Sequence, residues 1–110
     1  MDKHDKVFLI DILEAAQSTQ EFIAGCSKSS FMTDKMCKSA VVHEIEIMGE
    51  ATKQLSTEFR DSHKQIEWRS IAAMRDRLIH GYNLIDYEIV WSTVMDDIPE
   101  IIAHLRRLIG

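Results

Sequence analysis

Strong helix breakers are scarce in this chain. Its 110 residues include one proline and four glycines. Because proline and glycine mark the turns between short strands, their shortage favours a few long helices over a many-stranded sheet. The length fits a single domain over residues 1–110, whose core is large enough to fold without disulfides or a structural metal.

Cysteine is also sparse. Cys26 and Cys37 are the two in the chain, and they form no Cys-x-x-Cys pair. This spacing excludes the Cys/His quartet of a zinc knuckle. Cys37 lies within an apolar-periodic segment and is most simply a small core residue. Free thiols of this kind fit a reducing cytoplasm.

Long apolar runs are missing as well. The run that follows Lys6 meets charge again at Asp11 and Glu14, which makes it too short for a signal peptide. No stretch approaches the roughly 18 apolar residues that a membrane-spanning helix needs. We therefore expect a soluble, cytoplasmic protein with no membrane association.

Positive charge is in deficit. Thirteen Lys and Arg residues face 18 Asp and Glu residues, which gives a formal net charge of −5. Binding of nucleic acids is driven largely by Lys and Arg contacts with phosphates. Any RNA-directed role therefore requires a local basic site on an otherwise acidic protein.

Four segments carry apolar residues at helical spacing. They cover about residues 3–24, 34–57, 67–80 and 87–108. Short links join them, and consecutive helices with short links pack antiparallel. The sequence therefore predicts an all-α fold, an up-down antiparallel bundle of four to five helices.

Local signals set the expected helix ends. Gly25 is a natural stop for the first helix, Thr33 a plausible N-cap for the second and Asp86 an N-cap for the fourth. Pro99 is expected to kink the fourth helix or to restart it at a first-turn position. Residues 25–32 and 58–65 are rich in turn-forming or polar residues and are expected to be links.

The second segment has two features of interest. Gly49 lies in mid-helix, where glycine costs about 1 kcal/mol relative to alanine. It is either a tolerated defect or a point where another helix approaches closely. The expected apolar stripe of this helix consists of Met36, Ala40, Ile47, Ala51 and Leu55.

Arg75 has an unexpected position in the third segment. On an ideal wheel it projects from the middle of the apolar sector that contains Ile71 and Leu78. A cation there is costly unless it is paired. It either reaches to water or to a core ion pair, or it lies at a cleft or subunit interface where it binds an anion.

His80 follows at the expected end of the same helix. A histidine in that position is usually a cap and a partner of the helix dipole. Beside Arg75 and Tyr82 it gains a second interpretation, because a histidine can move protons and an arginine can hold a phosphate. The two side chains can converge only if the helix ends near His80.

A polar stripe runs along the second segment. A di-iron site would require matching Glu and Glu-x-x-His sets on the other helices, which are absent, so we expect no metal. The stripe is then either a solvated face, or a cleft wall in which Glu46 or Glu50 pairs with Arg75. Its members are Ser39, His43, Glu46, Glu50 and Lys53.

The pattern Arg75-x4-His80-x-Tyr82 resembles the R-x4-H-x-Y signature of the HepT branch of the HEPN ribonuclease-toxin family. The resemblance covers almost the whole chain, and R-x4-H alone would be weak evidence without the further matches. Those matches are Ile47-Met48-Gly49-Glu50-Ala51, Trp68-x-x-Ile71-x-x-Met74-Arg75, Val90-Trp91 and Pro99. Met48 departs from the family pattern, which has an aliphatic residue there.

The resemblance implies a HEPN fold and a homodimer in which two R-x4-H sites face each other across one cleft. It implies a toxic, metal-independent endoribonuclease that needs no cofactor. Its partner would be a nucleotidyltransferase antitoxin of the MNT type, which transfers AMP from ATP to the signature tyrosine, here Tyr82. Transfer RNA is the favoured substrate, because family members often attack structured translation RNAs.

The chemistry of these residues fits that activity. His80 can act as general base or acid while the 2′-hydroxyl of the RNA is the nucleophile, and Arg75 can stabilise the charged phosphate. Asp76, Arg69 and Arg77 could line the same cleft. The alternative is a non-catalytic subunit that holds nucleotide or substrate for a nucleotidyltransferase, with Arg75 binding phosphate and His80 structural. A purely structural dimer would leave Arg75 unexplained.

Overall fold

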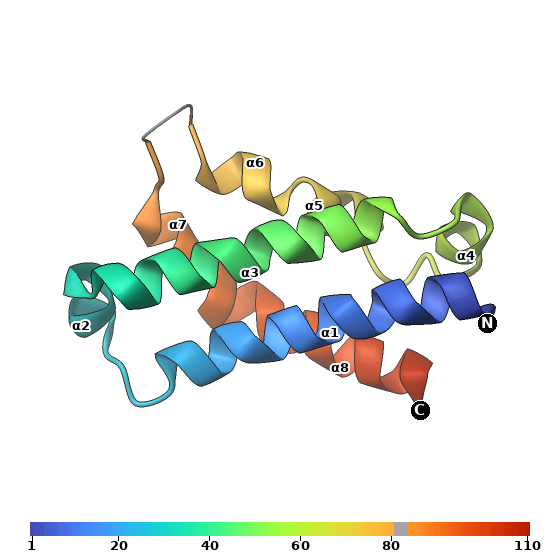
Figure 1. The fold of residues 1–110 in the computed structure, drawn as a ribbon, viewed down its shortest axis with the longest axis horizontal. Helices are drawn as coiled ribbons and strands as arrows, with labels where there is room; N and C mark the ends of the chain where they lie inside the picture. The colour runs from blue at the N-terminus through green and yellow to red at the C-terminus, as the bar shows by residue number, and fades with distance from the viewer. Residues whose placement is uncertain (81–83) are drawn as a thin grey trace.

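The computed structural model describes residues 1–80 and 84–110. The longer runs of helix are α1 (Lys3–Ile23), α3 (Lys35–Lys53), the pair α5 (Trp68–Ala72) and α6 (Met74–Leu78), and α8 (Ile98–Ile109). They alternate in direction along the longest axis, with α1 on one side of α3 and α5–α6 on the other, and α8 packs against α1 (Figure 1). The described residues form no strand, so the expected all-α fold is confirmed.

α1 ends where the sequence predicts. Gly25 has a φ of +78°, a conformation that suits glycine after a helix end. At the other end the side chain of Asp2 accepts a hydrogen bond from the backbone N–H of Asp5 at 2.8 Å. The buried face of α1 includes Leu9, Ile12, Ala16 and Ile23, as its periodicity predicts.

Two short helices occupy segments that were expected to be links. α2 (Lys28–Thr33) and α4 (Thr57–Ser62) begin at Ser27 and Ser56, whose side chains accept hydrogen bonds from backbone N–H groups inside each helix. Phe31 and Phe59 hold them against the core and are 0% and 7% exposed. A serine N-cap and one buried aromatic side chain are thus enough to stabilise a helix of one or two turns, even in a polar segment.

The buried face of α3 differs from the expected stripe. Met36 is 85% exposed, whereas Val41, Ile45 and Met48 are fully buried. α3 lies between α1 on one side and α5–α6 on the other, so two of its faces are buried. A single apolar stripe describes a helix that buries one face only. Its N-cap is Asp34 rather than Thr33, because the Asp34 carboxylate accepts from the Cys37 N–H at 3.0 Å.

Gly49 marks a close approach between two helices. A Cβ added there would lie 3.2 Å from the carbonyl oxygen of Ala72 and 3.7 Å from that of Ile71. These backbone atoms belong to α5, and backbone yields less readily than a flexible side chain. The second interpretation of Gly49 is therefore confirmed: its missing side chain lets α5 pack directly on α3.

Pro99 restarts the last helical run. α7 (Tyr87–Ser92) is followed by a π-helical turn, η1 (Thr93–Asp97), and then by α8, with Pro99 in its first turn. Proline has no N–H to donate and its ring clashes with the carbonyl four residues earlier, so a widened turn ahead of it relieves both problems. The N-cap predicted for this run is correct, since the Asp86 carboxylate accepts from the Ile89 N–H at 3.1 Å.

Asp5 is a buried carboxylate that ties α1 to α4. It is 3% exposed and accepts hydrogen bonds of 2.8 Å from both the N–H and the hydroxyl of Ser56. Burial alone would raise the pKa of Asp5, but the hydrogen bonds from Ser56, helped by His4 and Asp2, outweigh it and lower the pKa. The ionised form is thus favoured in the folded protein.

We expect Asp5→Asn to reduce the pH dependence of folding. A carboxyl whose pKa is lowered in the folded state stabilises the protein above its unfolded pKa of about 3.9, and this contribution is lost as pH falls through the folded pKa. Asp5→Ala should cost about 2 kcal/mol at pH 7, the value of a hydrogen bond to a charged group. Urea unfolding at pH 7 and pH 3 measures both effects.

The exposed Asp11 on the same helix provides the control, because surface substitutions usually change stability by less than about 0.5 kcal/mol. The assignment would be contradicted if the difference in the free energy of unfolding between the wild-type protein and Asp5→Asn were the same at pH 7 and at pH 3.

In the part of the chain that the structure describes, no helix combines the length and apolar character needed to cross a membrane.

Candidate active site

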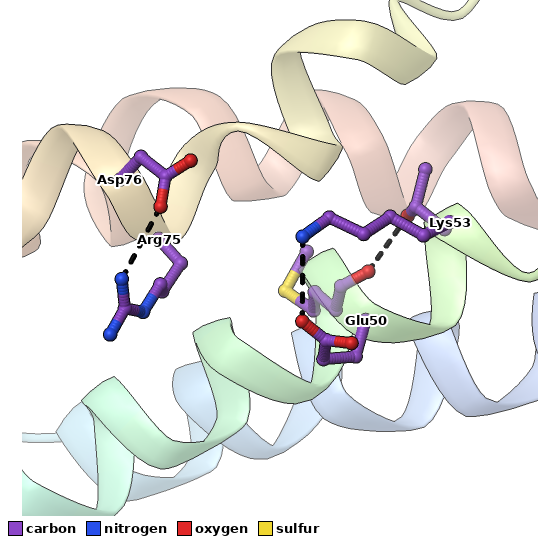
Figure 2. A network of polar contacts seen from close by, with 6 residues as sticks. Glu50, Lys53, Arg75 and Asp76 are labelled. Atoms are coloured by element: carbon purple, nitrogen blue, oxygen red, sulfur yellow. Dashed lines mark hydrogen bonds and ion pairs between the residues drawn. The ribbon is translucent and has the colours of Figure 1, made fainter.

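Arg75 lies on the surface of α6 rather than in an apolar sector. Its side chain is 48% exposed, and its Nη1 lies 3.3 Å from Oδ1 of Asp76 (Figure 2). The expected position is wrong because the third segment is not one helix: it breaks at Ala73 (φ −88°, ψ −2°). The break removes the constant 100° step on which the wheel depends. Met74 and Leu78 supply the buried side of α6.

The break coincides with the contact between α5 and α3. The carbonyl groups that face Gly49 belong to Ile71 and Ala72, which directly precede it. Trp68 anchors the start of α5, being 5% exposed and donating from Nε1 to the carbonyl of His63 at 3.0 Å. α3 and Trp68 therefore set the position of α6 and of Arg75.

His80 lies beyond the end of α6, as convergence with Arg75 requires. The helix ends at Leu78, and Ile79 is extended (φ −109°, ψ 111°). His80 is exposed, and its backbone N–H donates to the carbonyl of Leu84 at 2.6 Å. It is thus not a helix cap, and its ring is accessible from solvent.

Backbone hydrogen bonds fix the chain just before residue 81 and just after residue 83. Ile79 and Ile85 form an antiparallel bridge, and the N–H of Asp86 donates to the carbonyl of Leu78 at 2.8 Å. The catalytic candidate His80 is therefore held by main-chain contacts. Tyr82, the expected site of AMP attachment, lies outside the described residues.

A hollow beside His80 involves residues that the sequence does not single out. Its lining comes from α2, from His80, from residues 84–86 and from the start of α7. Met32 comes from α2, and an aromatic ring comes from Tyr87 at the start of α7, under Nζ of Lys38 at 4.4 Å from the ring centroid. The full lining is Met32, His80, Leu84, Ile85, Asp86, Tyr87 and Glu88.

The acidic residues of α3 face elsewhere. Glu46 and Glu50 line a hollow shared with Asp11 and His43, on the side of α3 that meets α1. Oε1 of Glu50 pairs with Nζ of Lys53 at 3.5 Å (Figure 2). The ion pair of Arg75 is with Asp76, so the alternative in which Glu46 or Glu50 pairs with Arg75 does not hold within this chain. The alternative of a largely solvated stripe describes this face better.

The two other arginines that the sequence suggested for the cleft, Arg69 and Arg77, line separate hollows. Arg69 lies with Arg60 and Lys64 at the junction of α4 and α5. Arg77 faces the acidic side chains of Asp97 and Glu100, near the start of α8. The structure thus places Asp76 beside Arg75. The hollow that contains His80 is lined by neither Arg75 nor Arg69 nor Arg77.

Metal ligands do not cluster in the described part of the chain. Within residues 1–80 and 84–110, no three His, Cys, Asp or Glu side chains are placed to hold one ion. The signature residues offer two groups for chemistry: the exposed guanidinium of Arg75, the second residue of α6, and the exposed imidazole of His80 beyond its end. An imidazole can move a proton and a guanidinium can bind a phosphate, which suits cleavage of a phosphodiester.

Comparison with protein families decides which family this site belongs to. The model of the family described as "Ribonuclease HepT-like" matches residues 12–108, a range that includes Arg75, His80 and Tyr82. The chain belongs to the HepT-like ribonuclease family. The resemblance inferred from the signature residues is therefore confirmed.

Relatives in this HepT-like family match along nearly their whole length. A protein named "Probable ribonuclease HepT" from Thermococcus cleftensis is 38% identical over 98% of both chains. One named "Putative RNase" from Caldanaerobacter subterraneus subsp. tengcongensis is 36% identical over 97% of this chain and 96% of its own. Another "Putative RNase", from Methanocaldococcus jannaschii, is 38% identical over 99% of this chain and 91% of its own. No solved structure matches the chain.

Proposed function

We propose that this chain is a metal-independent endoribonuclease, the toxin of a toxin–antitoxin pair, with transfer RNA as its favoured substrate. The observation that carries the proposal is the exposure of both signature side chains in a HepT-like chain: Arg75 on α6, and His80 two residues beyond the end of that helix. An RNA substrate is supported by relatives that are named as probable or putative ribonucleases and that match this chain along nearly the full length of both proteins.

The proposed reaction uses the nucleophile that RNA itself carries. A ring nitrogen of His80 takes the proton of a 2′-hydroxyl, and the 2′-oxygen attacks the adjacent phosphorus. The bond from phosphorus to the 5′-oxygen breaks, the leaving oxygen takes up a proton from water, and His80 releases the proton it took to solvent. Arg75 donates hydrogen bonds to the phosphate oxygens, whose negative charge increases in the transition state. The products are a 2′,3′-cyclic phosphate and a 5′-hydroxyl.

We expect cleavage to persist in a chelator. Purified protein incubated with transfer RNA and excess EDTA should release fragments that end in a 2′,3′-cyclic phosphate. The physical reason is that the 2′-hydroxyl needs only a base and a cation, and both are side chains here. End-group analysis by mass spectrometry checks the product.

Cleavage that stops in EDTA and returns with magnesium would contradict the mechanism. Binding of transfer RNA or ATP without any cleavage, by a folded wild-type protein, would instead favour the non-catalytic subunit of a nucleotidyltransferase complex.

We further propose that the active form is a homodimer. The side chains of Arg75 and His80 are exposed, and the apolar Leu84 beside His80 is 68% exposed. A second copy would cover such apolar surface and bring two arginines and two histidines into one cleft. This would create the local positive charge that a chain of net charge −5 needs in order to bind RNA.

Sedimentation at micromolar concentration should therefore report twice the 12.7 kDa mass of the chain. Leu84→Lys should shift the equilibrium toward monomer, because it places a charge in the proposed contact. Met36→Lys, at an exposed methionine on α3, is the matched control and should leave the dimer intact. A wild-type protein that stays monomeric would remove the shared cleft.

A further inference from the structure

The two cysteines of the chain lie together although ten residues separate them. The thiol of Cys37, in the first turn of α3, donates to the carbonyl of Phe22 at 3.4 Å. The thiol of Cys26, just after α1, lies 4.0 Å from the same oxygen. Both residues are half-buried and both thiols are free. One backbone carbonyl thus holds the two sulfur atoms as neighbours.

We propose that Cys26 and Cys37 form an intramolecular disulfide when the protein meets a peroxide. The Cys26 thiolate attacks one peroxide oxygen, the O–O bond breaks, and water leaves, which gives a sulfenic acid on Cys26. The sulfur of Cys37 then attacks the sulfur of Cys26, the S–O bond breaks, and a second water leaves. Two thiols and one hydrogen peroxide become one disulfide and two waters.

The surroundings of the two thiols set the order of these steps. Burial raises the pKa of the Cys37 thiol, and the neighbouring Cys26 and Asp34 raise it further. Less of Cys37 is therefore ionised at neutral pH than of an ordinary thiol, so Cys37 is the poorer nucleophile toward the peroxide. It takes the second step, in which it loses its proton as it attacks the sulfenic acid. Cys26 lies at a helix end followed by the exposed Ser27, where a small oxidant can reach it.

The disulfide would close a loop around α2. Cys26 precedes the N-cap of α2, and Cys37 lies in the first turn of α3, so both ends of this short helix would be tied together. α2 packs on α7 through the rings of Phe31 and Trp91, whose centroids are 5.2 Å apart, and Met32 lines the hollow beside His80. Oxidation would thus make one wall of that hollow more rigid.

Thiol counting tests the proposal without any assay of RNA cleavage. The full chain is treated with a small excess of hydrogen peroxide at pH 7.5, and free thiols are titrated in denaturant. We expect the count to fall from two to none, the mass to fall by about 2 Da, and the melting temperature to rise by roughly 5–10 °C. Dithiothreitol should reverse all three changes.

Single serine variants are the matched controls. Cys26→Ser and Cys37→Ser should show neither the mass loss nor the rise in melting temperature, and peptide mapping of the wild-type protein should recover residues 26 and 37 in one cross-linked peptide. Thiols that survive peroxide, a gain of oxygen that persists in the wild-type protein, or a disulfide between two chains would each overturn the proposal.

Discussion

Replacing His80 with alanine is expected to lower the rate of RNA cleavage by about 10²–10⁴-fold, the usual contribution of one general acid–base group. His80 is exposed and held by main-chain hydrogen bonds on either side, so the substitution removes the imidazole and leaves its surroundings in place. Single-turnover cleavage of a transfer RNA measures the rate. Circular dichroism and sedimentation should match those of the wild-type protein.

His43→Ala and His104→Ala are the controls for this prediction. His43 lies on the stripe of α3 and His104 on α8, so neither shares the hollow beside His80. Both variants should keep nearly full activity. A dead His43→Ala with an active His80→Ala would mean that the wrong histidine has been assigned.

Arg75→Ala should reduce cleavage by a comparable factor of about 10²–10³, because it removes the cation that stabilises the transition state. The side chain is half exposed and its ion pair with Asp76 is a surface pair, so folding should change little. Arg75→Lys keeps the charge without the planar fork and should recover part of the activity. Arg77→Ala, two residues along α6, is the matched control.

Tyr82→Phe is expected to abolish regulation by a nucleotidyltransferase antitoxin. The substitution keeps the ring and removes the hydroxyl that would accept AMP, so the variant should remain active under conditions that silence the wild-type protein. An AMP group on Tyr82, two residues after His80 in the sequence, would add negative charge that opposes the binding of RNA phosphate. Incubation with antitoxin, ATP and magnesium, followed by peptide mass spectrometry, locates the modification.

Tyr87→Phe is a demanding control, because Tyr87 lines the same hollow as His80. It is half-buried, and the ammonium group of Lys38 lies over its ring. The Tyr87 variant should still be modified and silenced. AMP found only on Tyr87, with Tyr82 unmodified in the silenced protein, would overturn the assignment.

The sequence predicts the main helical segments because residues with strong backbone preferences mark where helices begin and end. Gly25, Asp86 and Pro99 each act at the place and in the way that their backbone preferences dictate. The short helices α2 and α4 escape a periodicity argument, since one turn or two cannot show a period. The residues that could have predicted them are the N-cap serines, Ser27 and Ser56. In segments rich in polar residues, these serines look like ordinary loop residues.

The candidate site was harder to predict because Arg75 depends on a helix break that no glycine or proline marks. The break at Ala73 arises where α5 meets α3, and a contact between segments is invisible to a wheel drawn on one segment. The buried Asp5 was missed for the same reason, because its partner Ser56 lies far along the chain. The signature residues were enough to identify the family. The environment of each of these residues depends on contacts between distant segments, which the sequence does not reveal.

The contact at Gly49 has a consequence for how this protein can evolve. It joins α3 to α5 through main-chain atoms, so the spacing of the two helices does not depend on which apolar side chains surround them. Side chains nearby can then be exchanged over generations while the arginine of the site keeps its place, provided that position 49 stays glycine. Substitutions around Gly49 therefore change the side-chain packing but not the relative position of α3 and α5.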